Sequence, residues 1–383
     1  MNSRAGTTHS SGRAAEGCTA ARASERPLAW GLLGARAGDN RQVEQLVEAL
    51  GYPHELQRLS FGPLNHLPNF IVGASFATVR RRESASLQPP WPDVVVSAGQ
   101  RAVPVACWIR KRSGGRSRLV QLGRPRAALS AFDLVVTTPQ YGLPADARVL
   151  ANTLPFQRPT SPDPKLLETW RDAFAALPRP WIALLVGGET WPLRFSARVA
   201  TELGRRASAA AAARGGSLLV TTSPRTGAAE TEALLRALDG PSFRNDWRSD
   251  RPGCYASILA LADAFIVTAD SISMLAEVSR SGKPVEIYPL ERRGGPWVWL
   301  ADRWSVGTPE PGTVSAMLAI LARAGILTPP RDLRRVASAL IACGAAVPFS
   351  AETAPQPGNS GLLRSEMDNT VARIRELVEA ERC

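Results

Sequence analysis

Short apolar runs alternate with amphipathic segments along most of the chain, the pattern of a parallel sheet whose strands are joined by helices. In the first half, amphipathic segments at 40–51 and 102–115 predict helices. Strands are predicted at 28–34, 53–61, 93–99, 118–123 and 132–139. Because runs such as DVVVSAG (93–99) are typical of buried strands, we expect the sheet to be covered on both faces.

The same alternation restarts beyond a proline-rich stretch. Residues 155–180 hold six prolines around one amphipathic segment, which is typical of a connector between domains. The strands predicted beyond it lie at 181–188, 217–223, 243–247, 264–269 and 285–290, and the last helices at 313–326, 331–343 and 361–381. The sequence therefore predicts an α/β fold of two Rossmann-like domains facing a cleft, with ligands at the carboxyl ends of the strands.

These patterns divide the chain into five parts. We predict a disordered tail (1–27), an N-terminal Rossmann-like domain on the acceptor or partner side (28–155), a linker (156–180), a C-terminal Rossmann-like domain on the nucleotide side (181–347), and a loop with a last helix (348–383).

Composition excludes several classes of protein. No apolar run reaches the 18 residues of a membrane span, and five scattered cysteines with three histidines do not predict a disulfide framework or a zinc site. We therefore expect a cytoplasmic protein that uses no metal and no cofactor.

Positive charge is concentrated in the first half. The net charge is +12, and residues 28–155 carry 15 Lys and Arg against eight Asp and Glu. A basic domain indicates an anionic partner, although an Arg- and Ala-rich composition would give the same excess. Arg80–Arg82 and Arg110–Arg112 could dock on anionic lipid at the inner face of the membrane, or they could be solvated faces.

The most informative segment for chemistry is 264–289. Its predicted strand ends at Ala269 and a helix begins near Asp270 and Ser271, so backbone N–H groups and the Ser271 and Ser273 hydroxyls could bind a diphosphate. Glu277 lies four residues beyond Ser273, on the same helix face, where it could bind ribose hydroxyls. Alternatively, Asp270 and Ser271 simply cap the helix.

Three other loops follow predicted strands. Gly187 and Gly188 could let a ligand approach the backbone or form an ordinary turn, and the hydroxyl-rich loop 221–226 with Arg225 could bind phosphate or be a plain polar loop. Asp39, after the first strand, could be a general base or a helix N-cap.

Several stretches together resemble the bacterial relatives of the plant mitochondrial-fission "elongated mitochondria" family. They include GDNRQVEQLVEALG (38–51), PDVVVSAGQR (92–101), FDLVVTTP (132–139), NTLP (152–155), LLVGG (184–188), LLVTTSPRT (218–226) and ADAFIVTADSISMLAE (262–277). The chain departs from the family pattern at Pro224–Arg225, where two arginines are common, and at Gly253–Tyr255, where Asn-Pro-Tyr is common.

The resemblance implies a GT-B type glycosyltransferase whose last helix returns to the first domain. It also implies a nucleotide-diphosphate sugar bound by the second domain and a catalytic base, for which Asp39 is our candidate. The donor-binding residues would be Gly187, Gly188, Ser223, Arg225, Thr226, Ser271, Ser273, Met274 and Glu277, with Asn40 and Gln42 on the acceptor side.

The predicted function is therefore metal-independent transfer of a sugar to an acceptor, which could be lipid-linked. Two alternatives stay open. The first is a non-enzymatic adaptor at an anionic membrane surface, and the second is an epimerase acting on the nucleotide-sugar. A nucleic-acid partner is not expected.

Overall fold

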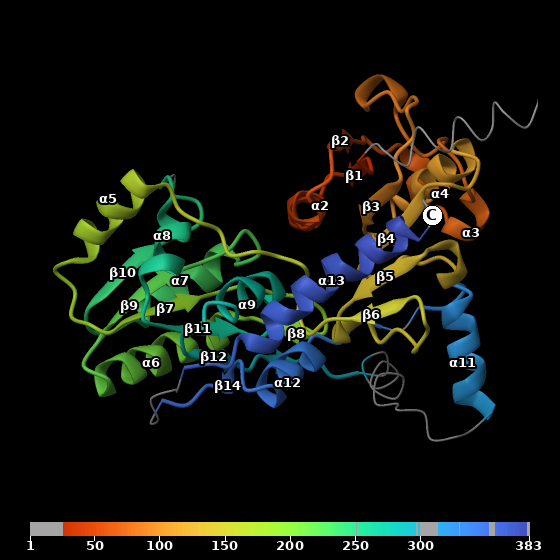
Figure 1. Ribbon diagram of the computed structural model, residues 1–383. Helices are drawn as coiled ribbons and strands as arrows, with labels where there is room; N and C mark the ends of the chain where they lie inside the picture. Colours follow the sequence, from red (N-terminus) through yellow and green to blue (C-terminus); the bar gives the residue numbers. More distant parts are fainter. Residues whose placement is uncertain are drawn as a thin grey trace, which may run out of the picture. The chain divides into compact units, whose positions relative to one another are not determined.

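The computed structural model describes residues 26–249, 251–295, 298, 313–328, 330–351 and 357–380. All but the last two residues of the predicted tail, 1–27, lie outside this range. Figure 1 labels the helices and strands.

Two six-stranded sheets organise the described chain. The first has the strand order β2-β1-β3-β4-β5-β6, and the second β10-β9-β7-β11-β12-β14. The strands of the first are β1 (Ala29–Leu33), β2 (His54–Arg58), β3 (Val94–Ala98), β4 (Arg118–Leu122), β5 (Leu134–Thr137) and β6 (Val149–Ala151). Those of the second are β7 (Trp181–Leu185), β9 (Ser217–Thr221), β10 (Ser242–Asn245), β11 (Ala264–Thr268), β12 (Val285–Tyr288) and β14 (Val347–Pro348).

Helices connect these strands, as the sequence predicts. They are α2 (Ala37–Leu50), α3 (Asn69–Val72), α4 (Val103–Arg112), α5 (Pro164–Phe174), α6 (Ala197–Ala213), α7 (Ala228–Arg236), α8 (Cys254–Leu261), α9 (Ile272–Val278), α11 (Thr313–Arg323), α12 (Arg334–Ala342) and α13 (Gly361–Glu379). Short 3₁₀ turns lie at η1 (Pro63–His66), η2 (Arg81–Glu83), η3 (Leu129–Ala131) and η4 (Pro139–Tyr141), and a small antiparallel pair joins β8 (Leu193–Arg194) to β13 (Glu291–Arg292). The α/β class with two parallel sheets is thereby confirmed.

The described chain divides into two compact units. Unit 1 comprises residues 26–121, 130–134 and 370–380, and unit 2 comprises 122–129 and 135–369. The second half of α13 belongs to unit 1, where Arg375 Nη2 donates to the carbonyl oxygen of Leu50 at 2.9 Å. The predicted return of the last helix to the first domain is thus confirmed, while the domain boundaries stay a prediction.

In unit 1, helix α2 packs its apolar face on the sheet. Val43, Leu46, Val47 and Leu50 are buried, at the spacing that places side chains on one side of a helix. The helix is followed by Gly51, whose φ of 69° is a backbone conformation that residues other than glycine rarely adopt.

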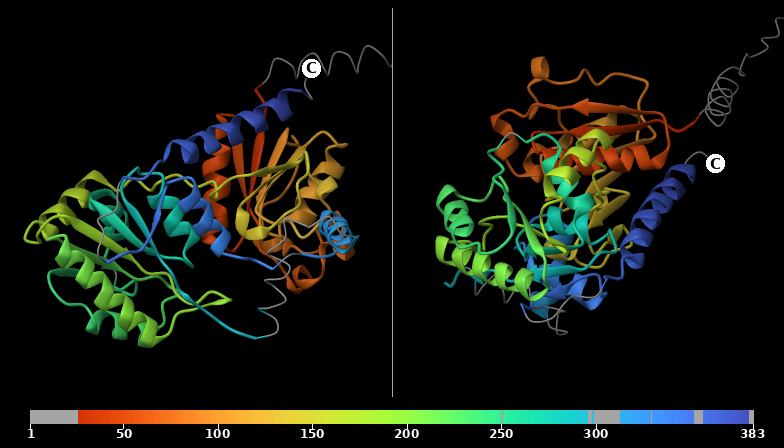
Figure 2. Two further views of the ribbon diagram at one scale, coloured as in Figure 1. Left: turned by 90° about the horizontal axis from the view of Figure 1, so that it is seen from below. Right: turned by 90° about the vertical axis from the view of Figure 1, so that its left-hand side faces the viewer.

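In unit 2, alternate residues of the strands face two different cores. Ile182, Leu184 and Val186 pack with the apolar side chains of α6 and α7, whereas Ala183 and Leu185 pack with α8, α9 and α12. Helix α6 therefore lies along one face of the sheet (Figure 2). A sheet covered on both faces explains why its inner strands β7, β9 and β11 are mainly apolar.

The proline-rich segment contributes to the core of unit 2. Asp163 caps α5, its carboxylate accepting from the N–H of Lys165 at 2.8 Å, and Pro164 begins the helix. Phe174, at the end of α5, is fully buried against Trp181 and Phe243. The stretch predicted as a linker therefore carries a helix that packs on the second sheet.

Strand β6 and the β8–β13 pair are absent from the sequence prediction, and two further details differ from it. Helix α2 begins at Ala37, with Arg36 at its N-cap, so Asp39 lies in the first turn and is not the N-cap. Strand β14, within a stretch predicted partly as loop, pairs with β12 over only two residues. Two residues are too few to produce a recognisable pattern, and Val347–Pro348 is exposed, so it is not marked by apolar burial.

Candidate functional site

Four loops of unit 2 follow neighbouring parallel strands of the second sheet. They come after β10, β9, β7 and β11, and because parallel strands end at one edge of a sheet, their first residues lie side by side. Three of the four carry predicted donor-binding residues: Gly187 and Gly188 after β7, Ser223–Thr226 after β9, and Ser271 after β11.

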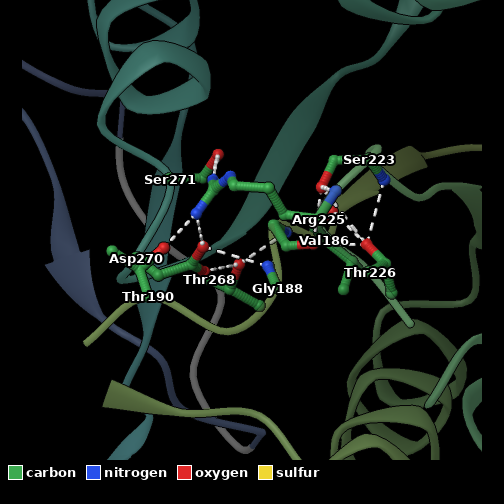
Figure 3. A network of polar contacts seen from close by, with 10 residues as sticks. Val186, Gly188, Thr190, Ser223, Arg225, Thr226, Thr268, Asp270 and Ser271 are labelled. Carbon is green, nitrogen blue, oxygen red and sulfur yellow. Dashed lines mark hydrogen bonds and ion pairs between the residues drawn. The ribbon is translucent and has the colours of Figure 1, made fainter. Parts of the chain in front are cut away.

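Asp270 is the centre of a polar network that joins these loops (Figure 3). Its side chain is fully buried, and its carboxylate accepts from the N–H of Gly188 at 3.0 Å, from the Thr268 hydroxyl at 2.7 Å and from Arg225 Nη1 at 2.7 Å. Thr268 in turn accepts from the N–H of Gly187 at 2.9 Å. Asp270 therefore fixes the loops after β7 and β9 relative to β11.

The two glycines are required by this network. A Cβ on Gly187 would lie 2.2 Å from the Asp270 carboxylate, and one on Gly188 would lie 2.1 Å from the carbonyl oxygen of Arg225. The room that the glycines leave is thus occupied by protein atoms, which favours a packing role over direct approach of a ligand.

The loop after β9 is held by its own hydroxyl groups. Ser223 Oγ donates to the carbonyl oxygen of Gly187 at 2.6 Å, and Thr226 Oγ1 donates to the same oxygen and accepts from the N–H of Ser223 at 3.0 Å. Both side chains are buried. Ser223 and Thr226 therefore shape the loop that carries Arg225.

Arg225 is the polar side chain of this network that reaches solvent. Its side chain is 43% exposed, and its guanidinium binds Asp270, the Thr190 hydroxyl and, at 3.2 Å from Nη2, the Ser271 hydroxyl. These contacts take three of its five N–H bonds, and among the described residues the Nε hydrogen and one Nη2 hydrogen have no protein acceptor. The guanidinium is thus oriented in advance, with donors left for an anionic ligand.

Burial governs the ionisation of Asp270. Loss of solvation raises the pKa of its carboxyl above the ordinary value, while Arg225, Thr268 and the N–H of Gly188 act in the opposite direction. The buried carboxylate is stabilised through Arg225, so the two residues form one functional unit.

Glu277 has a different environment from the one expected of a ribose ligand. It is 4% exposed, and its carboxylate accepts from Gln157 Nε2 at 2.8 Å and from the Tyr255 hydroxyl. Tyr255 belongs to the tripeptide at which the chain departs from the family pattern. Glu277 therefore connects α9 with α8 and with the segment before α5.

Arg280 strengthens the same connection. It is buried and donates to the carbonyl oxygens of Gln157 and Pro155, each at 2.9 Å, and burial lowers its pKa to about 10. Residues 155–157 are thereby held against α9 by two side chains, Arg280 and Glu277.

The remaining donor-side predictions lie on α9. Ser271 occupies the N-cap position without a side-chain capping bond, Ser273 is exposed and Met274 is buried. The capping alternative is thus wrong for the Ser271 side chain, whose hydroxyl accepts from Arg225.

The acceptor-side residues lie in unit 1, at the start of α2. Asn40 pairs through its amide with both the N–H and the carbonyl oxygen of Gly34, each at 2.8 Å, which fixes the turn after β1. Gln42 donates to the carbonyl oxygen of Gly38 at 3.3 Å. Asp39 is half-buried and its carboxylate lies beside Gly99, at the end of β3.

Sequence reasoning missed Trp191, one of two exposed tryptophans that follow strands of the second sheet. Trp191 is 48% exposed in the loop after β7, next to Thr190, which accepts from Arg225. Trp247 is 39% exposed after β10. Its backbone N–H donates to the Thr222 hydroxyl at 3.1 Å, and the Arg248 guanidinium lies 4.9 Å from its ring centre. Their exposure, which only the fold reveals, distinguishes them from core tryptophans.

A groove of about 460 Å³ lies between α7 and the end of β10. Arg248, one of its lining residues, also donates to the carbonyl oxygen of Thr226 at 3.5 Å. The groove contains none of the predicted donor-binding residues, being lined by Ala228, Thr231, Glu232, Leu235, Arg236, Arg244, Asp246 and Arg248.

Two further findings concern the described part of the chain as a whole. Within it, no three His, Cys, Asp or Glu side chains gather as metal ligands would, and metal independence stays a prediction. None of its helices has the length and apolar character needed to cross a membrane.

The described chain is thus an α/β protein with two parallel sheets, and a polar network lies at one edge of the second sheet. The family model described as "Mitochondrial fission ELM1" matches residues 37–301, and the chain belongs to this family. The resemblance found in the sequence is thereby confirmed.

Two relatives show how far the similarity extends. The mitochondrial fission protein ELM1 of Arabidopsis thaliana is 28% identical over 222 residues, which cover 51% of each chain, so the match spans about half the length of that protein. An uncharacterized protein of Rickettsia prowazekii, RP120, is 22% identical over 297 residues, covering 68% of this chain and 82% of that one.

Solved structures resemble the chain more distantly. A glycosyltransferase from Rickettsia africae is 9% identical with a TM-score of 0.41, covering 93% of this chain and 98% of that one. A putative UDP-N-acetylglucosamine 2-epimerase from Listeria monocytogenes is 12% identical with a TM-score of 0.43, covering 83% and 95%. Likenesses of this degree do not decide between the two activities.

Proposed function

We propose that the chain is a metal-independent glycosyltransferase of the GT-B type, and that unit 2 binds its nucleotide-diphosphate sugar. The observation that carries the proposal is the Arg225 guanidinium. It is held at the carboxyl edge of the second sheet by a fully buried carboxylate, and two of its N–H groups lack an acceptor among the described residues. A cation oriented before the ligand arrives stabilises a diphosphate without reorganisation during the reaction.

The exposed tryptophans fit the same ligand. Trp191 and Trp247 follow β7 and β10, and Arg225 follows β9, which lies between these two strands in the sheet. Aromatic rings beside a guanidinium are suited to a ligand that combines flat rings with phosphate, as a nucleotide-sugar does.

The proposed reaction replaces the diphosphate at the anomeric carbon by an acceptor hydroxyl. A base, for which Asp39 is our candidate, takes the proton of the acceptor hydroxyl, and the oxygen bonds to the anomeric carbon. The bond from that carbon to the diphosphate oxygen breaks, and the diphosphate leaves with the electron pair. Arg225 and the hydroxyls of Ser271 and Ser273 donate hydrogen bonds to the leaving group.

The other predicted donor residues have positioning roles in this proposal. Gly187, Gly188, Ser223 and Thr226 set the position of the Arg225 loop, and Met274 and Glu277 pack or anchor α9. Because Glu277 is buried and bound to Gln157 and Tyr255, its replacement would disturb the fold, and Arg225 is the better residue to test.

The test is a thermal-shift titration of the purified chain with nucleotides and nucleotide-diphosphate sugars, repeated on Arg225→Ala. A donor that stabilises the wild type should bind about 10- to 100-fold more weakly to the variant, the usual loss for hydrogen bonds to a charged group. Arg171→Ala is the matched control, because Arg171 is 48% exposed and pairs with Glu168 on α5 of the same unit.

Three results would count against the proposal. They are no shift with any nucleotide-sugar, an equal shift in wild type and a folded Arg225→Ala, and interconversion of nucleotide-sugars without an acceptor. The last would favour the epimerase alternative. Urea unfolding of each variant separates loss of binding from loss of structure.

A further inference from the structure

A loop of unit 1 combines exposed apolar side chains with a run of arginines. Leu64, Leu67 and Ile71 are 50%, 44% and 61% exposed, and they lie within eight consecutive residues. Arg80, Arg81 and Arg82 come directly after the residues that close this loop, and all three are exposed. From residue 59 to residue 82 the chain contains no Asp or Glu.

The structure of this loop shows that it is a defined projection. Its two ends are joined, because Phe61 and Val79 form an antiparallel bridge and the N–H of Gly62 donates to the carbonyl oxygen of Thr78 at 2.8 Å. The apolar residues therefore lie on η1, α3 and the residues next to them, beyond a closed base.

Contacts with α4 hold the projection in place. Asn69 Nδ2 donates to the carbonyl oxygen of Gln100 at 3.0 Å, and the Phe76 ring packs on Trp108 of α4 with centroids 5.1 Å apart. The Arg81 guanidinium lies over Phe76, at 5.7 Å from the ring centre. These contacts hold α3 beside α4 (Figure 1), while Leu64, Leu67 and Ile71 stay exposed.

We propose that residues 62–82 form a docking surface for an anionic phospholipid membrane. Leu64, Leu67 and Ile71 would enter the boundary between headgroups and acyl chains, and Arg81 and Arg82 would bind lipid phosphates. Charge decides in favour of this partner. Glu83 pairs with Arg80, whereas Arg81 and Arg82 have no acidic partner among the described residues and complement an anionic bilayer. The other basic run is less available, because Arg110 is paired with Asp133.

The experiment measures co-sedimentation of the full chain with vesicles of phosphatidylcholine alone and with phosphatidylglycerol added, at low and at high salt. The wild type should bind the anionic vesicles and dissociate as salt rises. Arg81→Ala/Arg82→Ala, which leaves the Arg80–Glu83 pair intact, should weaken binding by about 25-fold, at about fivefold for each basic residue near the surface.

The apolar contribution is tested by Leu64→Ser/Leu67→Ser/Ile71→Ser, which should weaken binding at least about 10-fold. Met317→Ser/Ile320→Ser is the matched control, because these side chains are 54% and 61% exposed on α11. Arg171→Ala/Arg205→Ala is the charge control, since both arginines are exposed on the surface of unit 2. Because the surface lies in unit 1, Arg225→Ala should bind vesicles as the wild type does, whatever its effect on nucleotides.

Several outcomes would overturn the proposal. They are equal binding to both kinds of vesicle, no binding to either, and a loss in the control variants as large as in the loop variants. Size-exclusion chromatography could give one more outcome that would overturn it. If the wild type is a dimer and the Leu64/Leu67/Ile71 variant a monomer, the surface is an interface between copies of the chain.

Discussion

Gly188→Ala tests whether the network around Asp270 is packed too closely to admit a Cβ atom at position 188. Gly188 is buried, and the added Cβ would lie 2.1 Å from the carbonyl oxygen of Arg225 and 2.4 Å from its carbonyl carbon. Ordinary contact requires the Arg225 peptide to move by about 1 Å or more. Its neighbours are bound to the chain at Gly187 through Ser223 and Thr226, so this shift strains the whole loop.

The expected loss in the free energy of unfolding is about 2–4 kcal/mol. Overpacking a well-packed site costs about 1–3 kcal/mol, and weakening the bond from the Gly188 N–H to Asp270 adds about 1 kcal/mol. We assign little of the loss to the ion pair between Arg225 and Asp270, because Arg225 is 43% exposed and water can replace part of that contact.

Urea unfolding followed by circular dichroism measures this loss. With two compact units the chain could unfold in two transitions, and the shift should then appear in only one of them. Gly38→Ala is the control, since nothing lies within 4 Å of its Cβ and alanine favours the helix by about 0.5–1 kcal/mol. A change below about 0.5 kcal/mol in Gly188→Ala would refute the packing argument.

Two other predictions concern ionisation. Because burial raises the pKa of Asp270, the folded chain keeps the proton of this carboxyl to a higher pH than the unfolded chain does. The free energy of unfolding of the wild type, relative to that of Asp270→Asn, should therefore fall as pH rises from about 4 and then level off. Urea titrations measure this difference, and a difference that grows with pH would contradict the prediction. Burial also raises the pKa of Cys254 to about 11, so at pH 8 its thiolate fraction is about one in a thousand. Alkylation of the native chain, mapped by mass spectrometry, should label Cys254 more slowly than the half-buried Cys343, and equal rates would show that Cys254 is accessible.

Much of the fold could be predicted from local pattern. The strands β3, β7 and β11 were predicted to within three residues at each end, because each is a short, mainly apolar run of the kind that a sheet covered on both faces requires. The location of the polar loops followed directly, since parallel strands place their carboxyl ends at one edge.

Partners of the site residues were harder to predict. The sequence suggested Glu277 as a ligand for ribose hydroxyls without its contact to Gln157, 120 residues earlier. Likewise, Arg225 was proposed as a phosphate ligand without its contact to Asp270, 45 residues away. No local pattern records such pairs, because they depend on which loops the sheet brings together.

The sequence by itself determined the order of strands and helices, the family and the two segments, 221–226 and 264–277, that meet at the sheet edge. Only the tertiary structure decided what each side chain does there. Periodicity reports which face of an element is buried, whereas a hydrogen bond needs two atoms within about 3 Å of each other. That distance is set by packing between distant segments, which is why Gly188 and Asp270 acquire their roles only in the folded chain.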